Sequence, residues 1–272
     1  MAWLILPNKF TRQPQFTVGL DRNNPITVGL QATFSPVMGR MVDTHQGNSV
    51  ASTSDTGTQQ IGVAGISRAY SATTGSIFAN RPRYQLASAM TIVIIVDVNT
   101  LTNYGTLISC FAGGEGWELD IGSQVSISNI FVQRVNATGA VQYSSGANRL
   151  TAGSKNNFIA VTYPSSAIES VPTIYVNGVA YSGSLLSSIG TGAQVASTAT
   201  LKMGAGPGTQ LDGAVLFAAL WSRALSADDI ESVRRNHAQV YQAPSRRIWA
   251  RVGFKAAFAR GSNYVINAGN AL

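Results

Sequence analysis

The stretch that decides the fold is 211–231, which reads LDGAVLFAALWSRALSADDIE. It opens with a Leu-Asp-Gly turn, and the apolar run 213–221 that follows predicts a buried strand. Ser226 is a good helix N-cap, and Asp229 three residues later completes a pattern like a capping box. Leu225 and Ile230 are spaced as a hydrophobic staple. This stretch therefore predicts a buried strand followed by a surface helix of about three turns.

Upstream of this stretch, apolar and β-branched runs alternate with Gly-rich or polar breaks. The run 90–98 is apolar at nearly every position, as expected of a central strand that is buried on both faces. Asn177-Gly178 is a strong hairpin signal, because both central positions of a type I′ turn need positive φ. No helices alternate with the strands, so the pattern predicts an antiparallel sandwich or barrel. The other predicted strands are 104–111, 116–121, 127–135, 141–145, 157–163, 173–176, 179–181 and 200–204.

Composition excludes several kinds of functional site and structural feature. Charged residues make up 11% of the 272-residue chain, against about 25% in an average globular protein. The one cysteine, Cys110, lies in an apolar run, which predicts a buried thiol and excludes an intramolecular disulfide. His45 and His237 have no companions at metal-ligand spacing. No apolar run approaches the roughly 20 residues of a membrane span, so we expect a soluble protein without a membrane partner.

The charge distribution divides the chain. Residues 1–231 carry 12 basic and 12 acidic residues, whereas 232–272 carry seven basic residues and no acid. Prolines and asparagines punctuate 1–27, which we interpret as an extended N-terminal arm. We expect a neutral body over 28–237 and a basic C-terminal arm over 238–272.

Several motifs resemble a known family. The stretch 211–231, the pair FIAVTY (158–163) and TIYVNG (173–178), MTIV (90–93) and LKMG (201–204) resemble, in order and spacing, the laminin-G-like, concanavalin A-like lectin/glucanase domains. The resemblance covers about 28–237. It implies an all-β antiparallel jelly-roll sandwich with one short C-terminal surface helix.

The segments on either side of the predicted domain suggest a biological setting for it. NNPITVGL (23–30) and YQAPSRRIW (241–249) resemble segments that bracket such domains in tailed-bacteriophage proteins. The resemblance implies a virion structural protein (a capsid decoration, head-fibre, collar or tail component) that binds other virion proteins and copies of itself. We expect the C-terminal arm to dock through Arg246, Arg247, Trp249, Arg251, Lys255 and Arg260. These residues are also basic enough to contact nucleic acid, but no nucleic-acid motif accompanies them, so we favour a protein partner.

Glu118-Leu-Asp120-Ile-Gly122 is the strongest candidate for catalysis. It resembles the Glu-x-Asp-x-Glu strand of the concanavalin A-like glucanases, in which the first Glu is the nucleophile and the last is the acid/base. Here Gly122 stands where the resemblance requires the proton donor. A retaining glycosidase needs both carboxyl groups, and we therefore expect no enzyme activity.

Carbohydrate binding is the alternative function. Trp117, Tyr104 or Tyr143 are aromatic residues that could form a sugar platform, and we take Trp117, Glu118, Asp120 and Tyr143 as the candidate glycan-binding residues. A structural Ca²⁺ held by Asp120 or by Asp212 of the Leu-Asp-Gly turn is a further alternative, but no dense Asp/Asn cluster accompanies them. We expect no metal site and no cofactor.

Overall fold

The computed structural model describes one body of the chain. The chain divides into two compact units, 1–241 and 242–272, and all described residues belong to the first. They are 20–37, 40–44, 50–51, 54–55, 57–62, 65–70, 75–102, 104–112, 114–123, 126–206 and 209–241.

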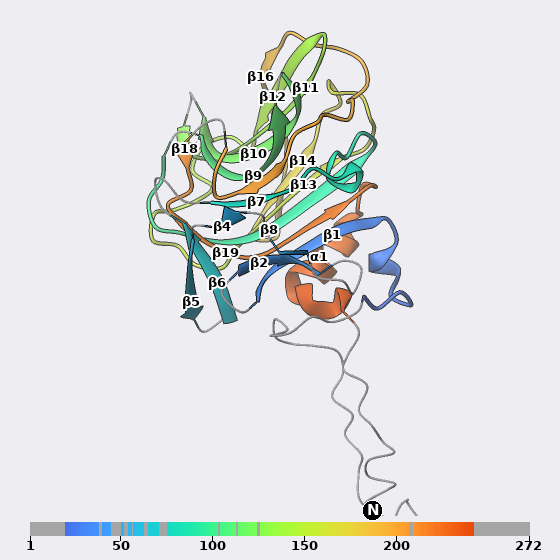
Figure 1. Cartoon of the computed structure of the whole chain (residues 1–272). Helices are drawn as coiled ribbons and strands as arrows, with labels where there is room; N and C mark the ends of the chain where they lie inside the picture. The colour runs from blue at the N-terminus through green and yellow to red at the C-terminus, as the bar shows by residue number, and fades with distance from the viewer. Residues whose placement is uncertain are drawn as a thin grey trace, which may run out of the picture. The chain divides into compact units, whose positions relative to one another are not determined.

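Two β-sheets stack face to face in this body (Figure 1). The ten-stranded sheet runs in the order β15 (Val179–Ser182), β14 (Thr173–Val176), β13 (Asn157–Tyr163), β8 (Met90–Val98), β19 (Gly213–Trp221), β1 (Leu30–Val37), β2 (Arg40–Asp43) and β3 (Val50–Ala51), with β6 (Gly65–Tyr70) beside β19 and β5 (Thr58–Gly62) beside β6. The nine-stranded sheet runs β16 (Ser184–Ser188), β12 (Gly139–Ser144), β11 (Ser126–Asn136), β10 (Glu115–Ser123), β9 (Gly105–Ala112), β17 (Leu201–Met203), β7 (Ser76–Phe78) and β4 (Ser54–Asp55), with β18 (Thr209–Gln210) beside β9. Among the described strands, every pair is antiparallel except β18 with β9. The predicted antiparallel sandwich is confirmed.

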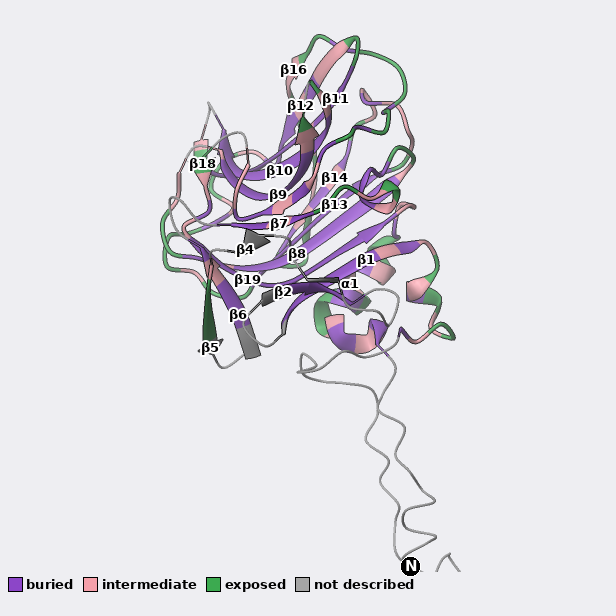
Figure 2. Ribbon diagram, in the orientation of Figure 1, coloured by how far each residue is buried: buried purple, intermediate pink, exposed green. Residues whose placement is uncertain are grey.

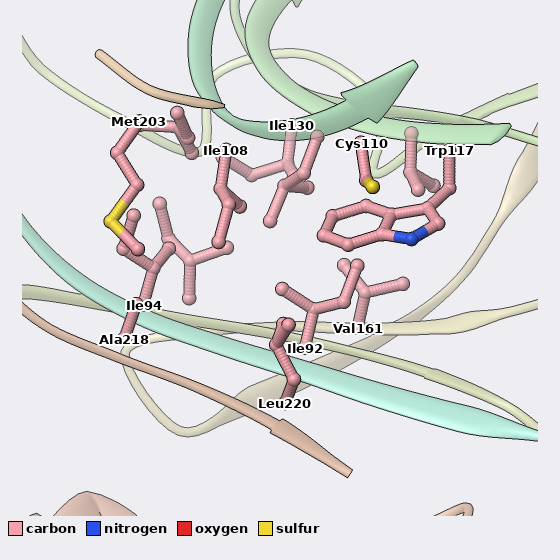
Figure 3. Packing of buried hydrophobic residues seen from close by; sticks show 14 of the residues in the cluster. Ile92, Ile94, Ile108, Cys110, Trp117, Ile130, Val161, Met203, Ala218 and Leu220 are labelled. Carbon is pink, nitrogen blue, oxygen red and sulfur yellow. The ribbon is translucent and has the colours of Figure 1, made fainter. Parts of the chain in front are cut away.

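The main core fills the space between the sheets. Cys110, Ile108 and Trp117 project from the nine-stranded sheet toward Ile92 and Leu220 of the ten-stranded sheet (Figure 3). Trp117 is fully buried, and its indole nitrogen donates a 3.0 Å hydrogen bond to the Tyr84 carbonyl. The predicted buried thiol of Cys110 is confirmed, and burial raises its pKa to about 12.

A second core lies on the other face of the ten-stranded sheet. There α1 (Ala227–Arg235) and the 3₁₀ helices η1 (Pro25–Thr27) and η3 (His237–Val240) cover β8, β13 and β19. Both faces of β8 and β19 are therefore buried, which explains their continuous apolar sequences. A third 3₁₀ helix, η2, spans Pro82–Tyr84.

The predicted helix start is confirmed. The Ser226 side chain accepts from the Asp229 backbone N–H, and the Asp229 carboxylate accepts in return from the Ser226 N–H. Leu225 and Ile230 are both buried. The helix spans nine residues, slightly less than the three turns predicted.

The described ends of the two predicted arms pack on this same face. Leu20 pairs with Tyr241 in an isolated β-bridge, and Ile26 is buried beside Trp221, whose indole donates to the Ile26 carbonyl at 2.7 Å. The rest of both arms lies outside the described residues. Among the described residues, no helix is long and apolar enough to cross a membrane.

Candidate functional site

The outer face of the nine-stranded sheet carries a polar surface. Strands β9 to β11 bend along their length, so that this face is concave (Figure 1). On β10, Trp117, Leu119 and Ile121 face the core, so Glu118 and Asp120 project to the concave face, because side chains alternate along a strand. The predicted common face of Glu118 and Asp120 follows directly from this alternation.

Strand register places further polar groups beside the two carboxyls. Ser109 of β9 and Gln133 of β11 lie opposite Glu118, on either side of it. Gln142 of β12 lies beyond Gln133, and Lys202 of β17 lies beyond Ser109. We call Lys202, Ser109, Glu118, Gln133 and Gln142 the polar row; it crosses five neighbouring strands.

A second row runs beside the first. Thr106 of β9 and Phe131 of β11 lie opposite Asp120, and Ser144 of β12 lies opposite Phe131. Thr106, Asp120, Phe131 and Ser144 are all buried, as is Glu118 of the polar row. By contrast, Gln133, Gln142 and Lys202 are half-buried and reach the surface. Figure 2 shows the burial of the whole sheet. The carboxyls thus form the floor of the face and the longer side chains its accessible part.

Buried oxygen atoms concentrate on this floor. Ten buried side-chain nitrogen and oxygen atoms among the described residues lack an ordinary donor–acceptor hydrogen bond, and six of them lie on this face. Three of the groups concerned interact with one another, because the Asp120 carboxyl lies beside the Glu118 carboxyl and the Thr106 hydroxyl. Buried polar groups are nearly always hydrogen-bonded, so such a cluster needs an explanation. The six atoms are Thr106 Oγ1, Ser109 Oγ, Glu118 Oε1, both carboxyl oxygens of Asp120, and Asn129 Oδ1.

The two carboxyls are electrostatically coupled. Burial, followed by the neighbouring Glu118 carboxyl, raises the pKa of Asp120 well above its ordinary value. A like charge and low solvation both favour the neutral acid. Asp120 therefore holds its proton more tightly than an ordinary carboxyl does, and its carboxyl hydrogen-bonds with that of Glu118.

Aromatic groups flank the polar row on both sides. Phe111 of β9 is half-buried, faces the concave side, and belongs to neither core cluster. Its cross-strand neighbour is Gly116, where an added Cβ would come within 2.0 Å of the Cys110 carbonyl oxygen. Any side chain at Gly116 would therefore collide with the backbone of β9, so this position requires glycine. On the other side, Tyr104 packs edge-on against Phe131 with ring centroids 5.2 Å apart.

The structure separates the four predicted glycan-binding residues. Glu118 and Asp120 lie together on the concave face, whereas Trp117 and Tyr143 point into the core and are 0% and 3% exposed. The Tyr143 hydroxyl donates to the Glu169 carbonyl at 2.6 Å. Neither ring presents a face to a sugar, so the sequence interpretation of these two aromatics as a platform needs correction. The alternation that sends Glu118 outward sends Trp117 inward.

Four residues of this face were missed from the sequence. Phe111, Gln133, Gln142 and Lys202 lie on four different strands, and only the pairing register brings them together. Each of them is the chain neighbour of a core residue: Cys110, Val132, Val141 or Met203. Because side chains alternate along a strand, the neighbour of a core residue points away from the core. Without the register, that signal does not select them from other half-exposed residues.

The candidate calcium residue Asp212 lies at the rim of the sandwich. Its carboxyl oxygens accept hydrogen bonds from Asn99 Nδ2 at 3.2 Å and Thr100 Oγ1 at 2.7 Å. Lys155 Nζ lies 3.1 Å from Asn99 Oδ1 and 3.9 Å from the Asp97 carboxylate. In this structure Asp212 acts as a turn residue beside a lysine. Within the described ranges, no three His, Cys, Asp or Glu side chains are grouped so that they could hold a metal ion.

The predicted assembly residues Arg246, Arg247, Trp249, Arg251, Lys255 and Arg260 lie outside the described residues, as does His45.

The comparisons with known proteins agree with this architecture. Residues 71–231 match the family model of the concanavalin A-like lectin/glucanases superfamily. The chain belongs to this superfamily. No curated protein sequence matches this concanavalin A-like domain.

Solved structures share its fold at low sequence identity. The binding domain of Paraclostridial Mosquitocidal Protein 1 superposes with a TM-score of 0.56 at 12% identity, over 77% of this chain and 52% of that one. A botulinum neurotoxin type C structure, described as dependent on two ganglioside molecules for cell entry, gives 0.56 at 14% identity, over 77% and 51%. A Trypanosoma rangeli sialidase gives 0.51 at 16% identity, over 84% and 37%. This concanavalin A-like domain therefore spans about half or less of these neighbours.

Proposed function

We propose that this chain binds a glycan on the concave face of its nine-stranded sheet and does not hydrolyse it. The observation that carries the proposal is the accessible part of the polar row, where Gln133, Gln142 and Lys202 reach the surface beside the buried oxygens of Ser109 and Glu118. Sugar hydroxyls both donate and accept, so they hydrogen-bond readily with amide and ammonium groups. Phe111, beside Gly116, offers a ring for the apolar face of a pyranose.

The absence of a third acid supports binding without hydrolysis. Gly122 follows Asp120 on the same strand at the position where glucanase-like strands supply the proton donor, and its φ of +81° favours glycine. The neighbours add support of a general kind, because one of them is described by its interaction with gangliosides. Release of reducing ends from a bound oligosaccharide by the wild-type chain would contradict the non-catalytic part of the proposal.

Glycan-array screening followed by calorimetric titration of the best oligosaccharide tests the binding site. Phe111→Ala and Gln142→Ala should each weaken binding about tenfold, since loss of one stacking or hydrogen-bonding contact amounts to roughly 1.4 kcal/mol. Tyr175→Ala and Gln60→Ala are matched controls, because both residues lie on the ten-stranded sheet, and binding should be unchanged. A glycan array that shows no binding would contradict the proposed site. Equal losses of affinity in the site variants and the controls would also contradict it.

We propose, second, that this chain is a structural component of a virion. This proposal concerns the setting in which the domain acts. It is supported by the segregation of charge, with 12 acidic and 12 basic residues up to 231 and only basic residues beyond. In this setting the basic arm attaches the domain to other virion proteins and the concave face meets a surface glycan.

Deletion of 242–272 tests the role of the arm. The truncated chain should fold, because it keeps both hydrophobic cores of the described body, and should fail to incorporate into particles. Incorporation at the wild-type stoichiometry would contradict the proposal, whatever the result of the glycan experiments.

A further inference from the structure

One charged side chain on the concave face reaches the surface. On the strands that build this face, β9 to β12 and β17, alternation turns the charged residues Glu118, Asp120 and Lys202 away from the core. Glu118 and Asp120 are 4% and 0% exposed, whereas Lys202 is half-buried. In the part of the chain that the structure describes, the Lys202 ammonium makes no ion pair and no hydrogen bond.

The buried acids do not neutralise this lysine. Ser109 lies between Lys202 and Glu118, which are therefore two strand spacings apart, roughly 10 Å across the sheet. Burial and the neighbouring Glu118 carboxyl hold the pKa of Asp120 above its ordinary value, which reduces the negative charge beneath the face. The accessible surface of the polar row therefore combines amide groups with one positive charge.

The Phe111 ring lies within reach of the same ammonium group. Phe111 follows Ser109 by two residues on β9, and Lys202 is the cross-strand partner of Ser109. In an antiparallel pair, residues on such a diagonal are about 7 to 8 Å apart, a separation that aromatic and long side chains can span. A pyranose that stacks on Phe111 can therefore place one of its substituents against Lys202.

We propose that the ligand of the concave face is an acidic glycan, and that Lys202 binds the carboxylate or sulfate group of a sugar whose ring stacks on Phe111. This inference rests on the proposed glycan site and adds the class of ligand. An ammonium group has three donors and no acceptor, and its strongest hydrogen bonds are those to anionic oxygens. A neutral glycan would cover the half-buried ammonium and remove part of its hydration without supplying an opposite charge.

A glycan array made of matched pairs tests the class of ligand. Each pair holds an oligosaccharide with a carboxylate or a sulfate group and the same oligosaccharide without that group, so the array also distinguishes the two anions. The wild-type full chain should bind the acidic member of its preferred pair about tenfold more tightly, as expected for one charge-assisted hydrogen bond. Lys202→Gln should bind both members equally, and Lys202→Arg should keep the preference.

Lys155→Gln is the matched control. Lys155 is exposed and lies just before β13 of the other sheet, beside Asp97. This variant loses the same charge and should keep the wild-type preference. Both glutamine variants should melt close to the wild type in circular dichroism, because each replaces a side chain that reaches the surface.

Salt dependence provides a second measurement. Raising the ionic strength from about 0.05 M to about 0.5 M shortens the screening length. It should therefore weaken binding of the acidic member by the wild type and leave binding by Lys202→Gln unchanged.

The outcomes separate this inference from the glycan site itself. Equal binding of acidic and neutral members by the wild type would overturn the inference and leave the glycan site standing. An acidic preference that persists in Lys202→Gln would overturn it as well. If the wild type binds no glycan on the array, the proposed function fails and this inference fails with it.

Discussion

At the scale of the residue, the two buried ionisable side chains Arg134 and Asp120 differ in their surroundings. Arg134 is fully buried, yet its guanidinium donates to the carbonyls of Ser165, Ala167 and Ser166 and lies 4.5 Å from the centre of the Tyr163 ring. Asp120 is equally buried, and its carboxyl lies beside the Glu118 carboxyl and the Thr106 hydroxyl. Arg134 therefore ties a loop to the sheet, whereas the surroundings of Asp120 favour its protonated form.

Asp120→Asn should stabilise the fold, and more so as the pH rises. The folded-state pKa of Asp120 lies above its unfolded value of about 3.9, so the folded state binds the extra proton. Stability that depends on this proton is fully present below the unfolded pKa and is lost as the pH rises through the folded pKa. The uncharged amide removes that loss. Thermal melting at pH 4 and pH 8 should show a larger gain at pH 8.

Asp228→Asn is the control for this experiment, because Asp228 is exposed on the first turn of α1. It removes one surface carboxyl and leaves the buried carboxyls in place, so the difference between the two variants isolates the effect of burial. A gain at Asp120→Asn that is equal at both pH values would show that folding does not raise the pKa of Asp120.

At the scale of the element, β10 shows how one strand serves both the core and the site. Trp117, Leu119 and Ile121 complete the core, while Glu118 and Asp120, from the same strand, form the floor of the concave face. A one-residue slip in register would exchange the two sets. The many apolar neighbours of Trp117 fix the register and so hold the carboxyls in place.

The helix α1 depends on its N-terminal cap. Ser226→Ala removes the acceptor for the Asp229 N–H and should lower the free energy of unfolding by about 1 kcal/mol. Denaturant unfolding measures the change. Ser226→Asn keeps an acceptor and should stay close to the wild type. An unchanged stability of Ser226→Ala would mean that the cap contributes nothing.

At the scale of the whole molecule, stability resides in the two cores of the described body. The 3₁₀ helix η3 and Tyr241 close the second core: Ala238, Val240 and Tyr241 are buried there, and the Tyr241 hydroxyl bonds with Ser35 and Thr44. The body is therefore expected to end at about residue 241.

Truncation tests this boundary. The chain 1–241 should melt within about 3 °C of the full-length chain, a change that corresponds to roughly 1 kcal/mol. The chain 1–236 loses three buried side chains and should be destabilised by several kcal/mol. Equal melting of the two truncated chains would contradict the assignment of η3 and Tyr241 to the core.

The sequence by itself determined the local structure. The predicted bounds of β8, β13, β14 and β19 agree with the structure, as does the cap at Ser226, because apolar alternation, the Asn177-Gly178 turn and capping chemistry act between neighbours along the chain. It missed β1 to β7 and β18. It also missed β16, whose sequence SLLSS has weak alternation and whose strand exists through pairing with β12.

Only the tertiary structure decided which residues share a face. Glu118 and Asp120 could be paired from the sequence because they lie two residues apart on one strand. Phe111, Gln142 and Lys202 could not, since their proximity depends on the register between strands that are far apart in the chain. The burial of Trp117 also depends on the tertiary structure. The sequence allowed an accessible ring, and packing against the other sheet buries it. Local periodicity encodes elements, whereas a binding face arises from pairing over long sequence distances.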